Sequence, residues 1–268
     1  MANPRFSVVD FFDLEAPYVT EYRRLLYKML NTHAGDALKS ILVTSAMVGE
    51  GKSTISSFLA MTAAAKKALK TLVIDVDLRR PSIHKLFGLS AEPGMVEILS
   101  KETETKSALR KSGLENLDIL PAGRVSGNPS EIFDADAIAG MIEEMKFYYD
   151  LILIDCAPLL PVSDPMLLAP RVDGTLLVVK AGATQKELVE RAAAILNPEE
   201  NKVLGVVLNN MNHILPYYYD YDYYHYDFHK PASKKTGNAP RAGATEPAEK
   251  ANIAGDDGQE LKDRLGQK

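Results

Sequence analysis

A glycine-rich segment with one lysine and one serine is the first part of the chain whose residue types could do chemistry. Residues 45–53 read Ser-Ala-Met-Val-Gly-Glu-Gly-Lys-Ser, between an apolar run and a helical pattern. Glycines let successive backbone N–H groups point at phosphate oxygens, and the helix dipole adds to the attraction. Lys52 would reach the β- and γ-phosphates and Ser53 would bind magnesium, although Ala46 stands where the strict pattern has glycine. We expect nucleotide contacts from Gly49, Glu50, Gly51, Lys52, Ser53 and Thr54.

Two aspartates follow a second apolar run, residues 72–74. Asp75 and Asp77 are two residues apart, and on a strand such residues point the same way. Beside bound phosphate, one carboxylate could deprotonate an attacking hydroxyl while the other helps to hold magnesium. The sequence leaves open which does which. A solvated loop whose charge is neutralised by Arg79 and Arg80 is the alternative.

A third aspartate, Asp155, ends the apolar run of residues 151–154. A lone carboxylate at the end of so apolar a strand is costly to bury unless it is paired, hydrated or bound to a metal. Near a phosphate-binding loop, it belongs on the magnesium side of the site. The predicted catalytic residues are therefore Lys52, Asp75, Asp77 and Asp155, and the predicted metal ligands are Ser53, Asp77 and Asp155.

Tyrosines are concentrated late in the sequence. Seven of the twelve lie within ten residues, at Tyr217, Tyr218, Tyr219, Tyr221, Tyr223, Tyr224 and Tyr226. Aspartates among them resist burial and the spacing fits neither a helix nor a strand, so the hydroxyls are predicted to face water. The alternatives are a solvated tail of biased composition, or metal binding through His225 and His229. Because a nucleotide site occurs in the same chain, we favour a kinase that carries its own substrate.

Apolar runs bounded by turn residues alternate with helical patterns through the middle of the chain. The runs are residues 41–44, 72–74, 117–120, 151–154, 175–179 and 203–208, and the helical patterns are residues 53–67, 130–146 and 185–196. This alternation predicts an α/β fold with a mostly parallel sheet and helices on both faces. In such sheets ligands bind beyond the carboxyl ends of the strands, which is where the loop and the aspartates stand.

Length and composition suit one α/β domain with a tail. The 268 residues are 46% apolar and 25% charged, and the net charge of −5 gives no support for nucleic-acid binding. The sequence has no long apolar run and no signal-peptide pattern, and its single cysteine, Cys156, suits a packed thiol, so we expect a cytoplasmic protein. The predicted divisions are a helical segment at 1–36, a nucleotide-binding domain at 37–216, the tyrosine cluster at 217–229 and a disordered tail at 230–268.

The sequence resembles the bacterial tyrosine kinases of capsular and exopolysaccharide synthesis, the BY-kinases, over roughly residues 15–228. The resemblance rests on a Walker A loop at residues 45–53, a Walker A′ motif at Asp75, Asp77 and Arg79, a Walker B motif at Asp155 and Pro158, and the tyrosine cluster. It implies a P-loop NTPase fold and a protein tyrosine kinase that uses ATP and Mg²⁺. It also implies autophosphorylation of the tyrosine cluster in trans.

The same resemblance implies partners. In the family, rings form through a helix that resembles Glu-x-x-Arg-x-x-Arg; this chain has Glu21 and Arg24, but Tyr27 replaces the last arginine, which leaves the ring size open. A surface ion pair is the alternative for Glu21 and Arg24. In the family's split form, a membrane protein activates the kinase and recruits it to the inner face of the cell membrane. Enzymes that make sugar-nucleotide precursors are implied as further substrates, and polysaccharide synthesis and export as the regulated process.

Two other functions are weighed against the kinase. ATPases of chromosome partition and division-site placement share the architecture, but they have a lysine where this chain has Met47 and they lack a tyrosine-rich tail. A catalytically quiet ATP-binding scaffold would be free to lose Lys52 or the aspartates, which this chain retains. Smaller predictions are an adenine-contacting or capping role for Asn209 and Asn210, and a strand-supporting or capping role for Asp164.

Overall fold

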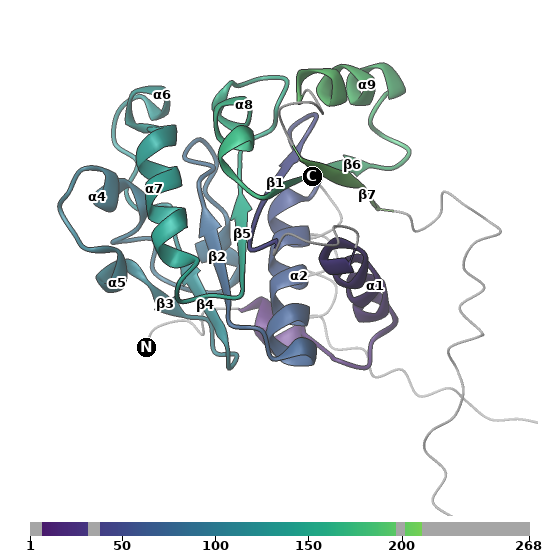
Figure 1. The fold of residues 1–268 in the computed structure, drawn as a ribbon, viewed down its shortest axis with the longest axis horizontal. Coiled ribbons are helices and arrows are strands. Elements are labelled where there is room, and N and C mark those ends of the chain that lie inside the picture. The colour runs from purple at the N-terminus through teal and green to yellow at the C-terminus, as the bar shows by residue number, and fades with distance from the viewer. Residues whose placement is uncertain (1–6, 32–37, 197–201, 211–268) are drawn as a thin grey trace, which may run out of the picture. The chain divides into compact units, whose positions relative to one another are not determined.

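Residues 7–31, 38–196 and 202–210 are described by the computed structural model (Figure 1). Within them a seven-stranded sheet has the order β3-β4-β2-β5-β1-β6-β7. The strands are β1 (Ser40–Ser45), β2 (Thr71–Asp75), β3 (Arg110–Lys111), β4 (Leu117–Leu120), β5 (Leu151–Asp155), β6 (Gly174–Lys180) and β7 (Val203–Asn209). Every pairing is parallel except that of β3 with β4, which is antiparallel. The predicted α/β fold with a mostly parallel sheet is confirmed.

Helices cover both faces of the sheet, as the sequence predicts. On one face α1 (Pro17–Asn31), α2 (Lys52–Lys67) and α3 (Ile83–Leu86) share a core with Ile41 and Leu153. On the other face α7 (Ala135–Met145), α8 (Asp164–Leu168) and α9 (Lys186–Ile195) share a core with Leu42 and Ile154. Neighbouring residues of a strand point to opposite faces, so the central strands are apolar at nearly every position.

Shorter elements complete the described part of the chain. They are the 3-10 helices η1 (Val8–Phe11) and η2 (Ala169–Arg171) and the short helices α4 (Met95–Leu99), α5 (Thr105–Ala108) and α6 (Pro129–Ile132). None of the helices in the described residues is long and apolar enough to span a membrane.

The single helix predicted over residues 130–146 is wrong. The structure has two helices there, α6 and α7, separated at Phe133 and Asp134. Asp134 has an extended backbone, and its side chain accepts hydrogen bonds from Asp136 N and Ala137 N, both at 3.0 Å. A side chain that satisfies the first N–H groups of a helix begins a new helix at that point. The apolar pattern carried no sign of this interruption.

The carboxyl ends of three central strands meet at one edge of the sheet. β5 lies between β2 and β1, and its last residue, Asp155, stands opposite Asp75 of β2 and Val43 of β1. β1 continues through residues 46–51 into α2, which begins at Lys52. The fold therefore gathers the phosphate-binding loop and the aspartates, which are far apart in the sequence, at a single edge.

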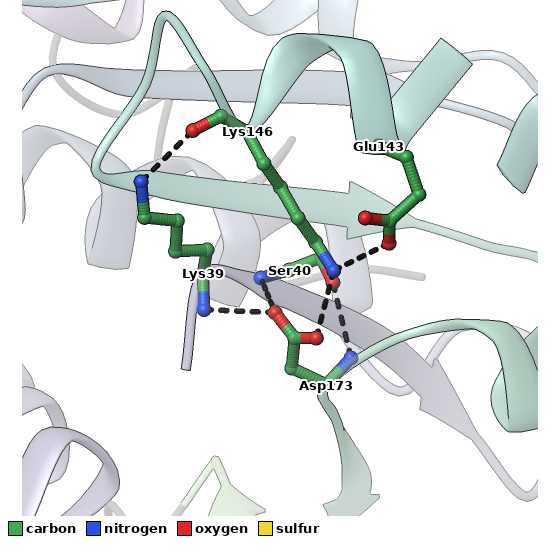
Figure 2. Close-up of polar contacts among 5 residues, drawn as sticks. All are labelled: Lys39, Ser40, Glu143, Lys146 and Asp173. Atoms are coloured by element: carbon green, nitrogen blue, oxygen red, sulfur yellow. Dashed lines mark hydrogen bonds and ion pairs between the residues drawn. The ribbon is translucent and has the colours of Figure 1, made fainter. Parts of the chain in front are cut away.

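A polar network ties together the opposite edge of the sheet, where β1 and β6 begin (Figure 2). Asp173, which precedes β6, accepts hydrogen bonds from Ser40 N at 2.8 Å and Lys39 N at 3.0 Å. The Lys146 ammonium, just after α7, lies 2.7 Å from Asp173 and 2.6 Å from Glu143. Lys39 Nζ donates in turn to Lys146 O at 2.8 Å. One carboxylate thus joins two strand starts to a helix end.

We expect Asp173→Asn to lower the free energy of unfolding by about 1–3 kcal/mol at pH 7, because Lys146 and two backbone N–H groups lose a charged partner. Burial would raise the pKa of Asp173, but the hydrogen bonds from Lys146, Ser40 and Lys39 outweigh it, and the pKa lies below its ordinary value. Such a carboxylate stabilises the fold above the unfolded-state pKa of about 3.9, and this contribution is lost as the pH falls through the folded-state pKa.

Urea titrations of wild type and Asp173→Asn should therefore show the largest difference in unfolding free energy near neutral pH, and a shrinking difference below about pH 4. Glu115→Gln, which removes an exposed carboxylate, is the control. A difference that does not change with pH would contradict the assigned role of Asp173.

Candidate phosphate-binding and carboxylate site

The loop between β1 and α2 adopts a backbone conformation that favours glycine at two positions. Gly49 and Gly51 have φ angles of 81° and 92°, in the left-handed region. Gly51 is the N-cap of α2, and a Cβ atom there would lie 2.1 Å from Asn209 Nδ2. Ala46, where the strict pattern has glycine, is fully buried, and its methyl group belongs to the hydrophobic core. The departure at this position is compatible with a phosphate-binding loop.

Lys52 and Ser53 begin α2 beside the strand ends. Lys52 is 7% exposed, and its charge acts on the Asp155 carboxyl group. The Ser53 hydroxyl donates to Asp155 Oδ2 at 2.5 Å and accepts from the Ser82 hydroxyl at 2.7 Å. Thr54, the last predicted nucleotide contact, follows in the first turn of the helix, half-buried. The structure therefore brings Lys52, Ser53 and Asp155 together, as the sequence predicts.

Asp75 and Asp77 have different surroundings, although the sequence could not separate their roles. Asp75 is fully buried; its Oδ2 accepts from Ser82 N and Ile83 N, each at 3.0 Å, and its Oδ1 accepts from Asp77 N at 3.2 Å. Asp77 is 5% exposed, and its Oδ1 accepts from Arg80 N at 3.0 Å. Both oxygens of Asp75 are thus committed to holding the loop after β2, whereas Asp77 has one oxygen engaged by that loop.

The Asp155 carboxyl group is buried with one oxygen that has no hydrogen-bond partner among the described residues, Oδ1. Burial raises the pKa of Asp155 to about 7, with a further contribution from Asp77, although Lys52 and Ser53 act in the opposite direction. Burial, and then the charge of Asp155, raises the pKa of Asp75 as well. The buried carboxyl groups of Asp75 and Asp155 thus have too little positive charge around them, and one oxygen of Asp155 has no hydrogen-bond donor among the described residues. A cation at the strand ends would supply what they lack.

Glu50 is one of the predicted nucleotide contacts, and in the structure its side chain forms hydrogen bonds with other parts of the protein. It is 2% exposed, and its Oε2 accepts from Met47 N at 2.6 Å. Its Oε1 accepts from the Thr184 hydroxyl, and from Lys180 N at 3.4 Å. Both oxygens of the carboxyl group thus accept hydrogen bonds from within the protein. A nucleotide contact from Glu50 would therefore come from its backbone N–H group, and this contact stays a prediction.

Arg79 and Asp164 form an ion pair beside the carboxylates. Arg79 Nε lies 3.5 Å from Asp164 Oδ2, and Asp164 is 3% exposed at the start of α8. Arg79 Nη2 also donates to the Ser130 hydroxyl in α6. The loop after β2 is thus attached to α6 and α8 through one guanidinium group. Asp164 thus contacts the loop after β2 through Arg79, and it is the first residue of α8, after the N-cap Ser163.

Other predicted residues lie away from the carboxylates or outside the described residues. The Arg24 and Glu21 side chains form an ion pair at 2.6 Å on α1 and are 63% and 42% exposed. Asn209 Nδ2 donates to Glu50 O at 2.9 Å, so its amide contacts the phosphate-binding loop. Cys156 follows Asp155, and burial raises the pKa of its thiol well above the ordinary value. The tyrosine cluster, His225, His229 and the predicted tail lie outside the described residues.

Sequence reasoning missed Ser82, Ser130 and Thr184. Each contacts a motif residue through a hydroxyl group: Ser53, Arg79 and Glu50, respectively. Serine and threonine are common in turns and at helix starts for reasons unrelated to any site, so their presence at these positions carried no signal. Only the fold shows that they support the motif residues.

Relatives of known name are similar to the chain over most of its length. The AAA domain family matches residues 38–183. Tyrosine-protein kinase YwqD of Bacillus subtilis is 32% identical over 204 residues, which are 76% of this chain and 85% of YwqD. Tyrosine-protein kinase CpsD of Streptococcus agalactiae is 31% identical over 221 residues, which are 82% of this chain and 96% of CpsD.

A solved structure agrees with these relatives. The kinase domain of Escherichia coli tyrosine kinase ETK superposes with a TM-score of 0.67 and 30% sequence identity, covering 71% of this chain and 74% of that domain. The similarity extends across the phosphate-binding loop and the three strand-end aspartates, since the matched AAA domain contains them all. The chain belongs to the family of bacterial tyrosine-protein kinases built on an AAA domain with a P-loop fold.

Proposed function

We propose that the chain is a protein tyrosine kinase that transfers the γ-phosphoryl group of ATP to tyrosine, including the tyrosines of its own cluster at residues 217–226. The observation that carries the proposal is the convergence of Lys52, Ser53 and three buried aspartates at one edge of the sheet. The names of its relatives support tyrosine as the acceptor. The family resemblance supports a role in regulating capsular and exopolysaccharide synthesis and export.

The loop offers the groups that bind the phosphates of a nucleoside triphosphate. Its left-handed glycines and the N-terminal end of α2 present backbone N–H groups to anionic oxygens. Lys52, at the start of α2, would neutralise charge on the transferred phosphoryl group. Phosphoryl transfer depends on positioning and charge neutralisation more than on covalent catalysis, and the site offers these two contributions.

Magnesium fits the residues present. Ser53 and Asp155 are in contact, the free oxygen of Asp155 is buried without a donor, and Asp77 lies close enough for its charge to raise the pKa of Asp155. No three His, Cys, Asp or Glu side chains in the described residues are grouped to hold a metal alone, so phosphate and water would complete the ligand set. When bound, the ion would neutralise phosphate charge, and Ser53 and Asp155 would hold it, with Asp77 beside them.

The environments of Asp75 and Asp77 support different roles. Asp75 already accepts three backbone N–H groups, so we assign it the positioning of the loop that carries Asp77, Arg79 and Ser82. Asp77, with one oxygen outside these loop hydrogen bonds, would be the carboxylate that orients the incoming tyrosine hydroxyl and accepts its proton. Because an unperturbed phenol has a pKa of about 10, the proton would move late, as the transfer proceeds.

The proposal also includes the proteins with which the kinase would interact. A neighbouring copy would present its tyrosine cluster to this site, in an oligomer that uses the exposed face of α1 with Glu21 and Arg24. A membrane adaptor would activate the kinase and recruit it to the inner face of the cell membrane. Sugar-nucleotide enzymes would be further substrates. These partners are supported by the family resemblance.

Lys52→Met should abolish autophosphorylation, with a loss of at least about 100-fold, because the site loses the cation that binds the phosphates. The measurement is mass-spectrometric mapping of phosphotyrosine after the purified full chain is incubated with ATP and Mg²⁺, with and without an activating segment of the adaptor. Lys67→Met, at the exposed far end of the same helix, is the matched control.

Phosphate on residues 217–226 in wild type and Lys67→Met, but not in Lys52→Met, supports the kinase. ATP hydrolysis without phosphotyrosine under either condition would instead support an ATPase of the partition type. Phosphate that appears only when another kinase is added would support the scaffold.

Asp77→Asn and Asp75→Asn should fail in different ways. Asp77→Asn should fold with a melting temperature near that of wild type and lose phosphotyrosine formation by at least about 100-fold, because it lacks the proton acceptor. Asp75→Asn should lose about 1–3 kcal/mol of stability, because an amide NH₂ would face backbone N–H groups that now donate to carboxylate oxygens. Thermal unfolding and autophosphorylation rates measured side by side test this. Equal melting temperatures for the two variants would contradict the division of roles.

A further inference from the structure

The Glu50 side chain connects the phosphate-binding loop to a loop outside every recognised motif. One of its oxygens accepts a hydrogen bond from Met47 N, within the loop, and the other accepts one from the Thr184 hydroxyl. The remaining contact to that second oxygen, from Lys180 N, is long at 3.4 Å. A carboxyl group that is 2% exposed needs a good donor at each oxygen. Thr184 is therefore the donor on which the position of the Glu50 carboxyl group depends most at that oxygen.

Thr184 is held in place by its own backbone. It lies in the turn between β6 and α9, and its N–H donates to Lys180 O at 3.0 Å. It stands 134 residues from Glu50 in the sequence and one residue beyond the stretch matched by the AAA domain. A hydroxyl group on an anchored turn is a fixed donor, because little freedom remains to be lost when the hydrogen bond forms.

A second contact reaches the same loop residue from a neighbouring strand. Asn209, at the end of β7, donates through Nδ2 to Glu50 O at 2.9 Å. The β6–α9 turn thus contacts the Glu50 side chain while β7 contacts its backbone. Gly51 and Lys52 follow at once and open α2, so a shift of Glu50 would displace the N–H groups and the ammonium group that receive phosphate.

We infer that Thr184 is a positioning residue for phosphate binding: its hydroxyl fixes the Glu50 carboxyl group, which holds the loop in the shape that receives the nucleotide. The inference rests on the proposed function, because it requires the loop to bind ATP. Thr184 acts through Glu50 and needs no contact with the nucleotide. The loop shape serves bound ATP in the ground state and the transition state alike, so loss of the hydroxyl should raise the KM for ATP more than it lowers kcat.

The test compares three variants of the full chain. Thr184→Val removes the hydroxyl and keeps the shape, Thr184→Ser keeps the hydroxyl, and Thr71→Val removes a hydroxyl that donates to Leu69 O at the amino end of β2. Titration calorimetry with ATP and Mg²⁺ should show a Kd about tenfold higher for Thr184→Val, equivalent to about 1.4 kcal/mol. Thr184→Ser should stay within about twofold of wild type, and Thr71→Val should match wild type.

Hydrogen exchange gives a readout that does not need nucleotide. In nucleotide-free protein, a peptide covering residues 46–52 should exchange faster in Thr184→Val than in wild type or Thr184→Ser, whereas a peptide from β4 should not change. If Thr184→Val does not fold, Thr184→Ala makes the same deletion with a smaller side chain and is judged by the same two measurements.

The outcomes separate the inference from the proposed function. If the wild-type protein binds no ATP, both the inference and the proposed function are overturned. Wild type that binds ATP, with Thr184→Val unchanged in affinity and exchange, would overturn the role of Thr184 alone. An equal loss of affinity in Thr184→Ser and Thr184→Val would also overturn it, because the hydroxyl would then not be the group that matters.

Discussion

The parallel pairing of β5 with β1 and β2 is the constraint on which the site depends. It places Asp155 opposite Asp75 on one side and against the strand that leads into the phosphate-binding loop on the other. Because side chains alternate along a strand, a slip of one residue would turn Asp155 to the other face and break its contact with Ser53. The apolar residues that fix this register also exclude water, and this burial raises the pKa values of Asp75 and Asp155.

Residues outside the motifs hold the motif residues in place. Asp75 is fixed by the N–H groups of Ser82 and Ile83, and Arg79 by Asp164 and Ser130. Together these contacts join the end of β2 and the loop after it to the starts of α3 and α8 and to α6. The site is thus stiffened from several directions by single polar contacts. Such an arrangement lets loops, which tolerate sequence change, still present reactive groups in a fixed geometry.

The sequence predicts most of the sheet and the meeting of the loop with the aspartates at its carboxyl edge, and there is a physical reason for each of these predictions. Strands buried on both faces must be apolar throughout, so β1, β2, β4, β5, β6 and β7 stand out as runs. The phosphate-binding loop is a local structure whose glycines and lysine are adjacent in the chain, so its motif is visible without a fold.

The remaining features depend on contacts between distant segments. The orientation of Glu50 depends on Thr184, and the difference between Asp75 and Asp77 depends on where the chain turns back at Ser82 and Arg80. The break at Asp134 is a capping event inside a continuous apolar pattern, and β3 has only two residues, too few for a periodic signal. Neither secondary-structure propensities nor the periodicity of apolar residues reveals such contacts and helix breaks.

The burial of Cys156 has a practical consequence. It is the single cysteine of the sequence, and in the fold its thiol is enclosed beside Asp155 with a raised pKa. The thiolate is the form of cysteine that attacks thiol reagents, so Cys156 of the folded protein should react with them very slowly. A cysteine introduced on the surface would then carry a spectroscopic probe without background. Slow labelling of Cys156 itself would report how often the centre of the sheet opens to solvent.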